Sequence, residues 1–141
     1  MIQRIQSLWL LLSTLCAAIT WLVPTFAGTS GDGSMKIFSI RESVILLFLI
    51  VFISAISFVN IFLFNNRRRQ KMIVWITVGA TIIFIGAQYL IVQQFKVSFQ
   101  IPQGNWEISA ILPIFIILFQ VFAFMGIRKD EQLINSADRM R

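Results

Sequence analysis

The chain of 141 residues has the length of one domain, and 57% of its residues are hydrophobic while only 13% are charged. With a mean hydropathy of +0.82, this composition excludes an ordinary soluble domain and indicates an integral membrane protein. The net charge of +6 could indicate nucleic-acid binding, but basic residues on the cytoplasmic side of spanning helices explain it more simply.

Four charge-free runs predict four transmembrane helices, at residues 5–26, 43–64, 72–95 and 108–127. Each holds about 20 residues or slightly more, which is enough to cross roughly 30 Å of hydrocarbon. The first run could instead be a cleavable signal peptide, but its apolar part is too long for one. The predicted fold is therefore all-α, a four-helix membrane bundle formed by the single domain 1–141.

The turn "NNRRRQK" between the second and third runs determines the predicted orientation. With the N-terminus inside, nine Lys and Arg residues lie on the cytoplasmic side and three lie outside, which predicts both termini in the cytoplasm. The turn could also bind an anionic lipid headgroup or ribosomal RNA, but a role in topology is preferred. Its basic residues are Arg67, Arg68, Arg69 and Lys71.

The two outer loops each contain a segment with the pattern of a strand. The first loop contains "MKIFSI", and in the second Val97, Phe99 and Ile101 alternate with polar residues. Because open strand edges are disfavoured, we predict that the two segments pair into a small extracytoplasmic sheet. Pro102 and Gly104 are expected to end the second strand. A lid over the helix ends is preferred to a surface for an outside partner.

Polar residues inside the runs are predicted to form hydrogen bonds between helices rather than to line a substrate path. Gly79 and Gly86, seven residues apart, predict a close contact between the third run and another helix. No Asp, Glu, Lys, Arg or His lies near the centre of a run, which argues against an ion-coupled transporter. The predicted interior polar residues are Ser57, Asn60, Gln88 and Gln120.

The residue types also argue against catalysis. The chain has no histidine and one cysteine, Cys16, so an intrachain disulfide and haem ligation by histidine are excluded. The six carboxylates lie near or beyond the ends of the runs, so they do not converge as metal ligands. Without histidine, a serine nucleophile would need a lysine or aspartate at its own depth, and none is evident. We therefore predict no enzyme activity, no cofactor and no metal.

The polar tail, residues 128–141, contains neither proline nor glycine and predicts a short cytoplasmic helix. Leu133, Ala137 and Met140 fall at spacings of four and three, which places them in one apolar stripe. A mixed-charge helix with such a stripe favours docking against a protein, either its own bundle or a partner, over a solvated end.

The opening "MIQRIQSLWLLL" and the ending "GIRKDEQLINSADRMR" resemble those of a family of uncharacterised small four-span membrane proteins from Bacteroidota. The resemblance covers the whole chain, and its end motifs are more specific than its apolar middle. It implies an inner-membrane location in a Gram-negative cell and no assigned activity. The residues that carry it are Met1, Gln3, Arg4, Gln6, Arg128, Lys129, Asp130, Glu131, Leu133, Asp138, Arg139 and Arg141.

These residues, apart from Met1, are also the predicted partner-binding residues, because both end motifs are expected on the cytoplasmic side. Within this surface we hypothesise that Arg4 pairs with Asp130 or Glu131. The predicted function is a non-enzymatic accessory subunit that contacts lipids and other subunits of an inner-membrane complex, first of protein export machinery and second of a respiratory assembly. The alternative is a small homo-oligomeric carrier or lipid-handling protein, which would require a wet cavity instead of a dry bundle centre.

Overall fold

The computed structural model describes residues 3–63 and 66–139, with side chains placed for residues 5–63 and 66–133. Each of its four long helices contains a stretch long and apolar enough to cross a membrane. This confirms the prediction of four long apolar helices, which suggest a multi-pass membrane protein. The helices are α1 (Gln3–Leu22), α2 (Val44–Phe62), α3 (Arg67–Ser98) and α4 (Leu112–Arg139).

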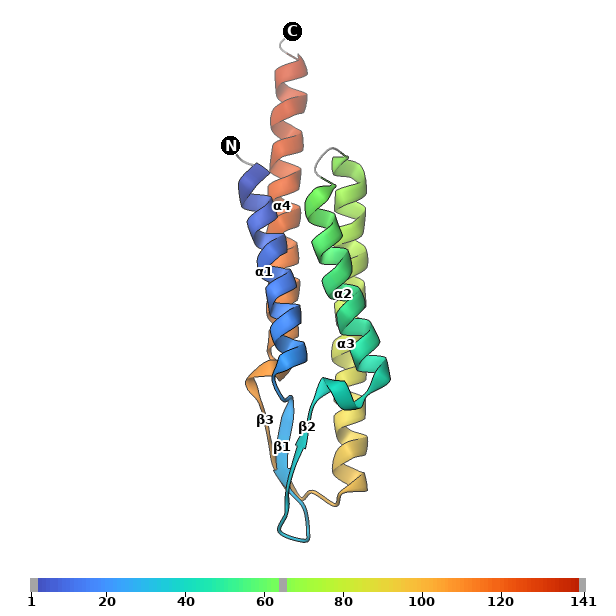
Figure 1. Ribbon diagram of the computed structural model, residues 1–141. Coiled ribbons are helices and arrows are strands. Elements are labelled where there is room, and N and C mark those ends of the chain that lie inside the picture. The colour runs from blue at the N-terminus through green and yellow to red at the C-terminus, as the bar shows by residue number, and fades with distance from the viewer. Residues whose placement is uncertain (1–2, 64–65, 140–141) are drawn as a thin grey trace.

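The four helices run alternately up and down and form a bundle (Figure 1). α1 packs mainly against α2 and α4, and α3 packs mainly against the same two helices. One end of the bundle holds the start of α1, the end of α2 and the start of α3, beside residue 130 of α4, and we call it the basic end because it carries residues 67–69 and 128–129. The strands lie at the opposite end, the sheet end (Figure 1).

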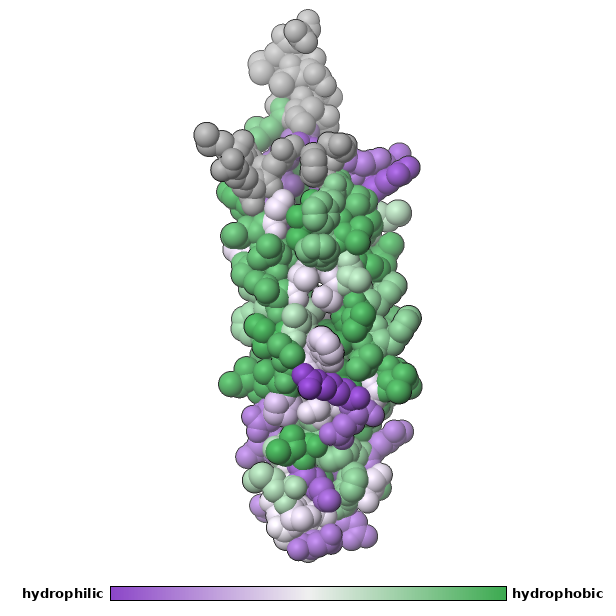
Figure 2. Space-filling model, in the orientation of Figure 1, coloured by the Kyte–Doolittle hydropathy of each residue, from purple (hydrophilic) through white to green (hydrophobic). Residues whose placement is uncertain are grey.

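The outward side chains of the bundle are mostly apolar. Figure 2 shows hydrophobic residues over the helical part of one face and hydrophilic residues at its two ends. Leu8 and Phe48 are among the exposed apolar residues, whereas Ile53, Phe84 and Ile116 are completely buried between the helices. Contact between such a surface and lipid tails costs no free energy, whereas its exposure to water would be unfavourable. The exposed apolar band therefore fits a bundle that spans a bilayer.

A proline determines where α1 ends, and an N-terminal capping residue determines where α3 begins. α1 ends at Leu22 rather than at Phe26, because Pro24 has no N–H to donate and favours an extended residue before it. α3 begins before the predicted residue 72, because the Oδ1 atom of Asn66 accepts a hydrogen bond from the N–H of Arg69 at 3.3 Å. The basic turn therefore forms the first turn of α3.

α4 continues through the polar tail without a break. The fourth span and the predicted C-terminal helix form one helix of 28 residues, so the tail is helical as expected but is not a separate element. At about 1.5 Å per residue this helix exceeds the roughly 30 Å of a bilayer core. Figure 1 shows that α4 extends beyond the starts of α1 and α3 at the basic end.

Three short strands pair at the sheet end, so a small sheet exists as predicted, but only one of its strands lies in a predicted segment. They are β1 (Phe26–Thr29), β2 (Met35–Phe38) and β3 (Gln103–Trp106). β1 is the central strand and pairs antiparallel with both of the others. β2 lies where the sequence predicted a strand, in the segment "MKIFSI".

The predicted second strand is wrong in position. Val97 belongs to the last turn of α3, and the N–H of Phe99 donates to the carbonyl of Phe95 at 3.1 Å. The rings of Phe95 and Phe99 also contact each other, with centroids 4.7 Å apart, as residues four apart on a helix do. Gly104 lies inside β3 instead of ending a strand. The two predicted strands do not pair with each other, because β1 lies between β2 and β3.

Replacing Gly104 with alanine is expected to destabilise the sheet by about 2 kcal/mol through overpacking. The added Cβ would lie 2.2 Å from Cζ of Phe26 and 3.0 Å from the carbonyl oxygen of Ala27. The Phe26 ring is fully buried and packs against Trp106 with centroids 5.8 Å apart, so it has little room to move. Thermal unfolding in detergent measures the loss. Gly31→Ala is the control, since its Cβ would be 3.8 Å from the nearest atom, and an equal loss there would contradict the prediction.

Candidate functional site

Gln120, in the first third of α4, joins three helices through its side chain. The side chain is fully buried, and its Nε2 atom donates to the hydroxyl of Ser13 in α1 at 2.9 Å and to that of Ser57 in α2 at 2.8 Å. Its Oε1 atom has no hydrogen-bond partner among the described residues. The two donated bonds have the geometry expected of polar contacts that hold membrane helices together.

A second polar pair closes the turn between α2 and α3. The Nδ2 atom of Asn60 donates to the carbonyl of Gln70 at 3.5 Å, and the Nε2 atom of Gln70 donates to the carbonyl of Asn60 at 3.4 Å. Both side chains are buried, so each bond also satisfies a group removed from solvent. Gln88, deeper in α3, is buried with its Oε1 atom unpartnered within the described part of the chain.

The close helix contact expected at the glycines of α3 lies elsewhere. A Cβ at Gly79 or Gly86 would meet no atom within 4 Å, so these glycines do not face a neighbouring helix closely. The close approach is at Gly126 of α4, where a Cβ would lie 2.9 Å from Cγ of Gln6 in α1. The missing side chain at Gly126 therefore lets Gln6 lie across α4.

Gln6 reaches a buried carboxylate one turn farther along α4. Its Nε2 atom donates to Oδ2 of Asp130, and Nη1 of Arg67 lies 3.7 Å from the same oxygen. The next residue, Glu131, accepts a hydrogen bond from Nζ of Lys71. These five residues, which we call the clasp, connect the end of α4 to the starts of α1 and α3.

The two ion pairs of the clasp differ in burial. The side chains of Arg67 and Asp130 are 22% and 6% exposed, whereas those of Lys71 and Glu131 are 25% and 37% exposed. A buried carboxylate needs a compensating charge and hydrogen bonds, while a more exposed pair contributes little by itself. The Oδ1 atom of Asp130 has no hydrogen-bond partner among the described residues. The attachment of α4 therefore depends mainly on Asp130.

The predicted partner-binding residues separate into an inward and an outward set. Gln6, Asp130 and Glu131 belong to the clasp and face their neighbours in the bundle. The exposed members are Arg128, Lys129 and Leu133. The side chains of Gln3, Arg4, Asp138 and Arg139, and the whole of Arg141, lie outside the described residues.

The basic turn supplies the cations that the acids of the tail contact. The hypothesis of an Arg4 ion pair falls on a side chain outside the described residues, whereas Arg67 and Lys71 contact Asp130 and Glu131 directly. The turn that was predicted to determine topology thus also holds the tail. Its other two arginines, at positions 68 and 69, are exposed.

Sequence reasoning missed Gly126 and the inward direction of Asp130, although a signal for both exists. Gln120, Ala123, Ile127 and Asp130 follow one another at spacings of three and four, and all four side chains are buried. Gly126 lies four residues before Asp130 and thus near the same face. The buried face of α4 therefore ends in a carboxylate, which the apolar stripe proposed from Leu133 onward did not include.

The chemistry of the clasp is that of an attachment. Its two carboxylates contact the Gln6 amide and the two cations, although Nη1 of Arg67 and Oδ1 of Asp130 have no hydrogen-bond partner among the described residues. Within residues 5–63 and 66–133, no three histidine, cysteine, aspartate or glutamate side chains gather closely enough to hold a metal ion. What the arrangement does is to fix the position and direction of α4 where it leaves the bundle.

Comparison with known proteins identifies the family. No curated protein and no solved structure matches the chain. One family model, described as "Domain of unknown function (DUF4293)", matches residues 2–140 and so includes the bundle, the sheet and most of the two end motifs. The resemblance to an uncharacterised family is thereby confirmed, while the bacterial group named with it stays a prediction. The chain belongs to this family of unknown function.

Proposed function

We propose that the protein is a non-enzymatic accessory subunit of a larger inner-membrane complex, with its basic end in the cytoplasm. The observation that supports this is the continuation of α4 as one helix to Arg139, beyond the starts of α1 and α3 (Figure 1). A helix that extends past its own bundle offers its last turns to another molecule. The bundle serves as the anchor.

The clasp supports the proposal because it holds the projecting helix in one direction. Asp130 and Glu131 are bound to α3, and Asp130 is also bound to α1, just before the helix leaves the bundle. A docking element that is already ordered loses less conformational entropy when it binds than a flexible tail would. The projecting turns are thus prepared for a partner.

Protein export machinery is our first candidate for the complex, and a respiratory assembly is the second. By sequence, nine Lys and Arg residues fall on the side of the two termini and three fall on the opposite side. This bias favours the basic end in the cytoplasm. Export machinery offers partner surfaces there and a lipid-facing flank for a small bundle.

The alternative function, a small homo-oligomeric carrier or lipid-handling protein, is less well supported. It would need a wet cavity around the predicted interior polar residues. Ser57 and Gln120 bind each other, and Asn60 is paired with Gln70 across a turn. These contacts use the polar groups to hold helices together, which favours the accessory subunit.

A form that ends at Leu133 is expected to lose the partner while keeping its fold. This form retains all five residues of the clasp and removes residues 134–141. Tagged full-length protein from gently solubilised native membranes should carry a stoichiometric partner by mass spectrometry, and the shortened form should not. A form ending at Ile127 would be unsuitable, because it also removes Asp130.

Asp32→Asn is the matched control, because this exposed residue lies in the turn between β1 and β2 at the sheet end. We expect this variant to keep the partner. Retention of the partner by the form ending at Leu133 would show that the projecting turns are not its docking site. Recovery of the protein alone, as the same oligomer in all forms, would overturn the accessory function and favour the carrier.

A further inference from the structure

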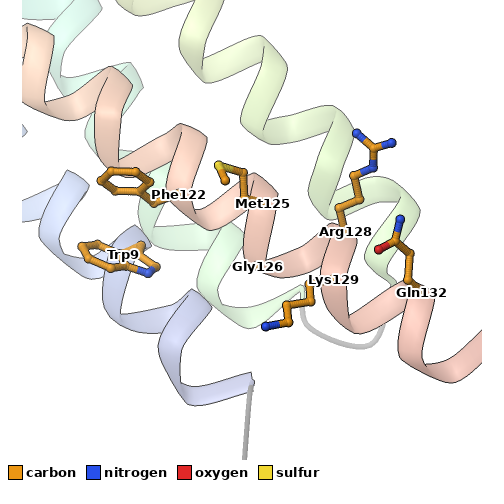
Figure 3. Close-up of a pocket in the computed structure, with 7 residues that line it drawn as sticks. All are labelled: Trp9, Phe122, Met125, Gly126, Arg128, Lys129 and Gln132. Atoms are coloured by element: carbon orange, nitrogen blue, oxygen red, sulfur yellow. The ribbon is translucent and has the colours of Figure 1, made fainter.

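An open groove of about 640 Å³ runs along α1 and α4 at the basic end, outside the clasp (Figure 3). Its apolar part is formed by Trp9 of α1 and by Phe122 and Met125 of α4. The rings of Trp9 and Phe122 contact each other with centroids 5.1 Å apart, which gives this part a firm aromatic wall. The volume is within the range of roughly 300–1,000 Å³ that small-molecule sites occupy.

The groove changes from apolar to basic within one turn of α4. Phe122, Met125, Lys129 and Gln132 follow one another at spacings of three or four, so they form one strip along the helix. Both cations line the groove about one turn beyond Met125, and Figure 3 shows their side chains leaving α4 on different sides. One turn is about 5.4 Å, which is a distance over which a bilayer changes from acyl chains to headgroups.

The positive charge of the groove is not balanced by the acids beside it. Asp130 and Glu131 adjoin Lys129 in sequence, but they face the bundle and pair with Arg67 and Lys71. Within the described part of the chain, neither Arg128 nor Lys129 forms an ion pair with a carboxylate. The clasp thus turns Asp130 and Glu131 inward and leaves Arg128 and Lys129 at the groove.

We propose that this groove binds one anionic phospholipid. Its phosphate lies beside Lys129 and Arg128, and an acyl chain lies along Trp9, Phe122 and Met125. Charge complementarity and the apolar-to-basic order of the strip both select an amphipathic anion over a soluble one. The site is separate from the basic turn and goes beyond the proposed function, because it requires no partner subunit.

Quenching of Trp9 fluorescence by brominated lipids tests the proposal directly. A variant with the other three tryptophans replaced by phenylalanine reports on the groove alone. It is placed in phosphatidylcholine vesicles with increasing amounts of brominated phosphatidylglycerol, or of brominated phosphatidylcholine as the neutral probe. We expect brominated phosphatidylglycerol to quench at much lower mole fractions. In Arg128→Ala/Lys129→Ala, the apparent affinity for brominated phosphatidylglycerol should fall roughly 30-fold, because each cation near a membrane surface raises the affinity for anionic lipid about five-fold.

The matched control is Arg68→Ala/Arg69→Ala. It removes the same charge from exposed positions at the same end of the bundle, outside the groove. We expect this control to keep most of the preference for phosphatidylglycerol. An equal loss in both double variants would mean that general surface charge attracts the lipid. Equal quenching by both lipids in the parent variant would mean that the groove has no anion site, and either result overturns the proposal.

A protein helix is the other occupant that such a groove could take. In that case, Trp9 in a gently solubilised preparation would be shielded from both brominated lipids until a co-purifying protein is removed. That result would also overturn the lipid proposal. Because the vesicle experiment uses only the purified chain, its outcome does not depend on whether the accessory function is correct.

Discussion

Alanine in place of Asp130 is expected to lower the free energy of unfolding by about 3 kcal/mol, the low end of the cost of breaking a buried ion pair. Asp130 is 5% exposed, accepts a hydrogen bond from Gln6 and lies 3.7 Å from Arg67. Its loss leaves Arg67 without a carboxylate in a mostly buried position. The low end applies because the Arg67 side chain is 22% exposed and water relieves part of the penalty. Unfolding in mixed detergent micelles, followed by tryptophan fluorescence, measures the change.

Glu131→Ala is the neighbouring control for this prediction. Its pair with Lys71 is more exposed, so we expect a loss below about 1 kcal/mol. The double variant Arg67→Ala/Asp130→Ala should lose less than the sum of the two single variants, because the charges depend on each other. Equal losses for Asp130→Ala and Glu131→Ala, or additivity in the double variant, would refute the clasp as the main attachment of α4.

Shortening Gln120 to alanine is expected to cost about 3 kcal/mol, because it removes two interhelical hydrogen bonds and leaves a cavity in the bundle. Gln120→Met keeps nearly the same volume and loses only the bonds to Ser13 and Ser57, so it should cost about 1 kcal/mol. The same unfolding assay separates the two variants. The difference between them measures packing, and the loss in the methionine variant measures the polar contacts.

Thr81→Val is the control for a buried polar group that joins no helices. The Thr81 hydroxyl donates to the carbonyl of Thr77 in its own helix at 2.8 Å, so its removal should change the stability little. A neutral Gln120→Met variant would mean that the contacts of Gln120 do not hold the bundle together. If Gln120→Cys reacted readily with a water-soluble thiol reagent, the bundle centre would be wet and the carrier function favoured.

The four long apolar helices could be predicted because long apolar runs are a strong and local signal. The errors at their ends have local causes. Pro24 ends α1 early. The cap at Asn66 starts α3 early, in a segment that its charged residues had suggested was a solvent-exposed turn. The tail was correctly expected to be helical, since it contains no residue that would interrupt a helix.

The strands were harder to predict because short segments support more than one pattern. Phe95 and Phe99 are spaced for one side of a helix, yet Phe99 also belongs to an alternating pattern with Val97 and Ile101. β1 contains the sequence "FAGT", whose small residues carry almost no signal for a strand. Its central place in the sheet comes from its pairing with two distant segments.

The clasp shows the limit of the prediction most clearly. The sequence places several cations and three acids at the same end of the bundle, and spacing indicates that Asp130 faces inward. Which of the three arginines, Arg67, Arg68 or Arg69, pairs with Asp130 depends on the rotation of α3 about its axis. Successive residues of a helix point in directions about 100° apart. Packing of the whole bundle sets that rotation, and no local pattern reports it.

The central position of β1 also has a consequence for the order of biosynthesis. Only residues 30–34 separate β1 from β2, so this hairpin can form soon after the first loop emerges. β3 follows α2 and α3, and its pairing must wait until the third helix is in place. Until then, one edge of β1 has unpaired backbone groups. A chain arrested before β3 thus exposes a strand edge that the finished protein covers, which gives quality-control factors a mark of incomplete insertion.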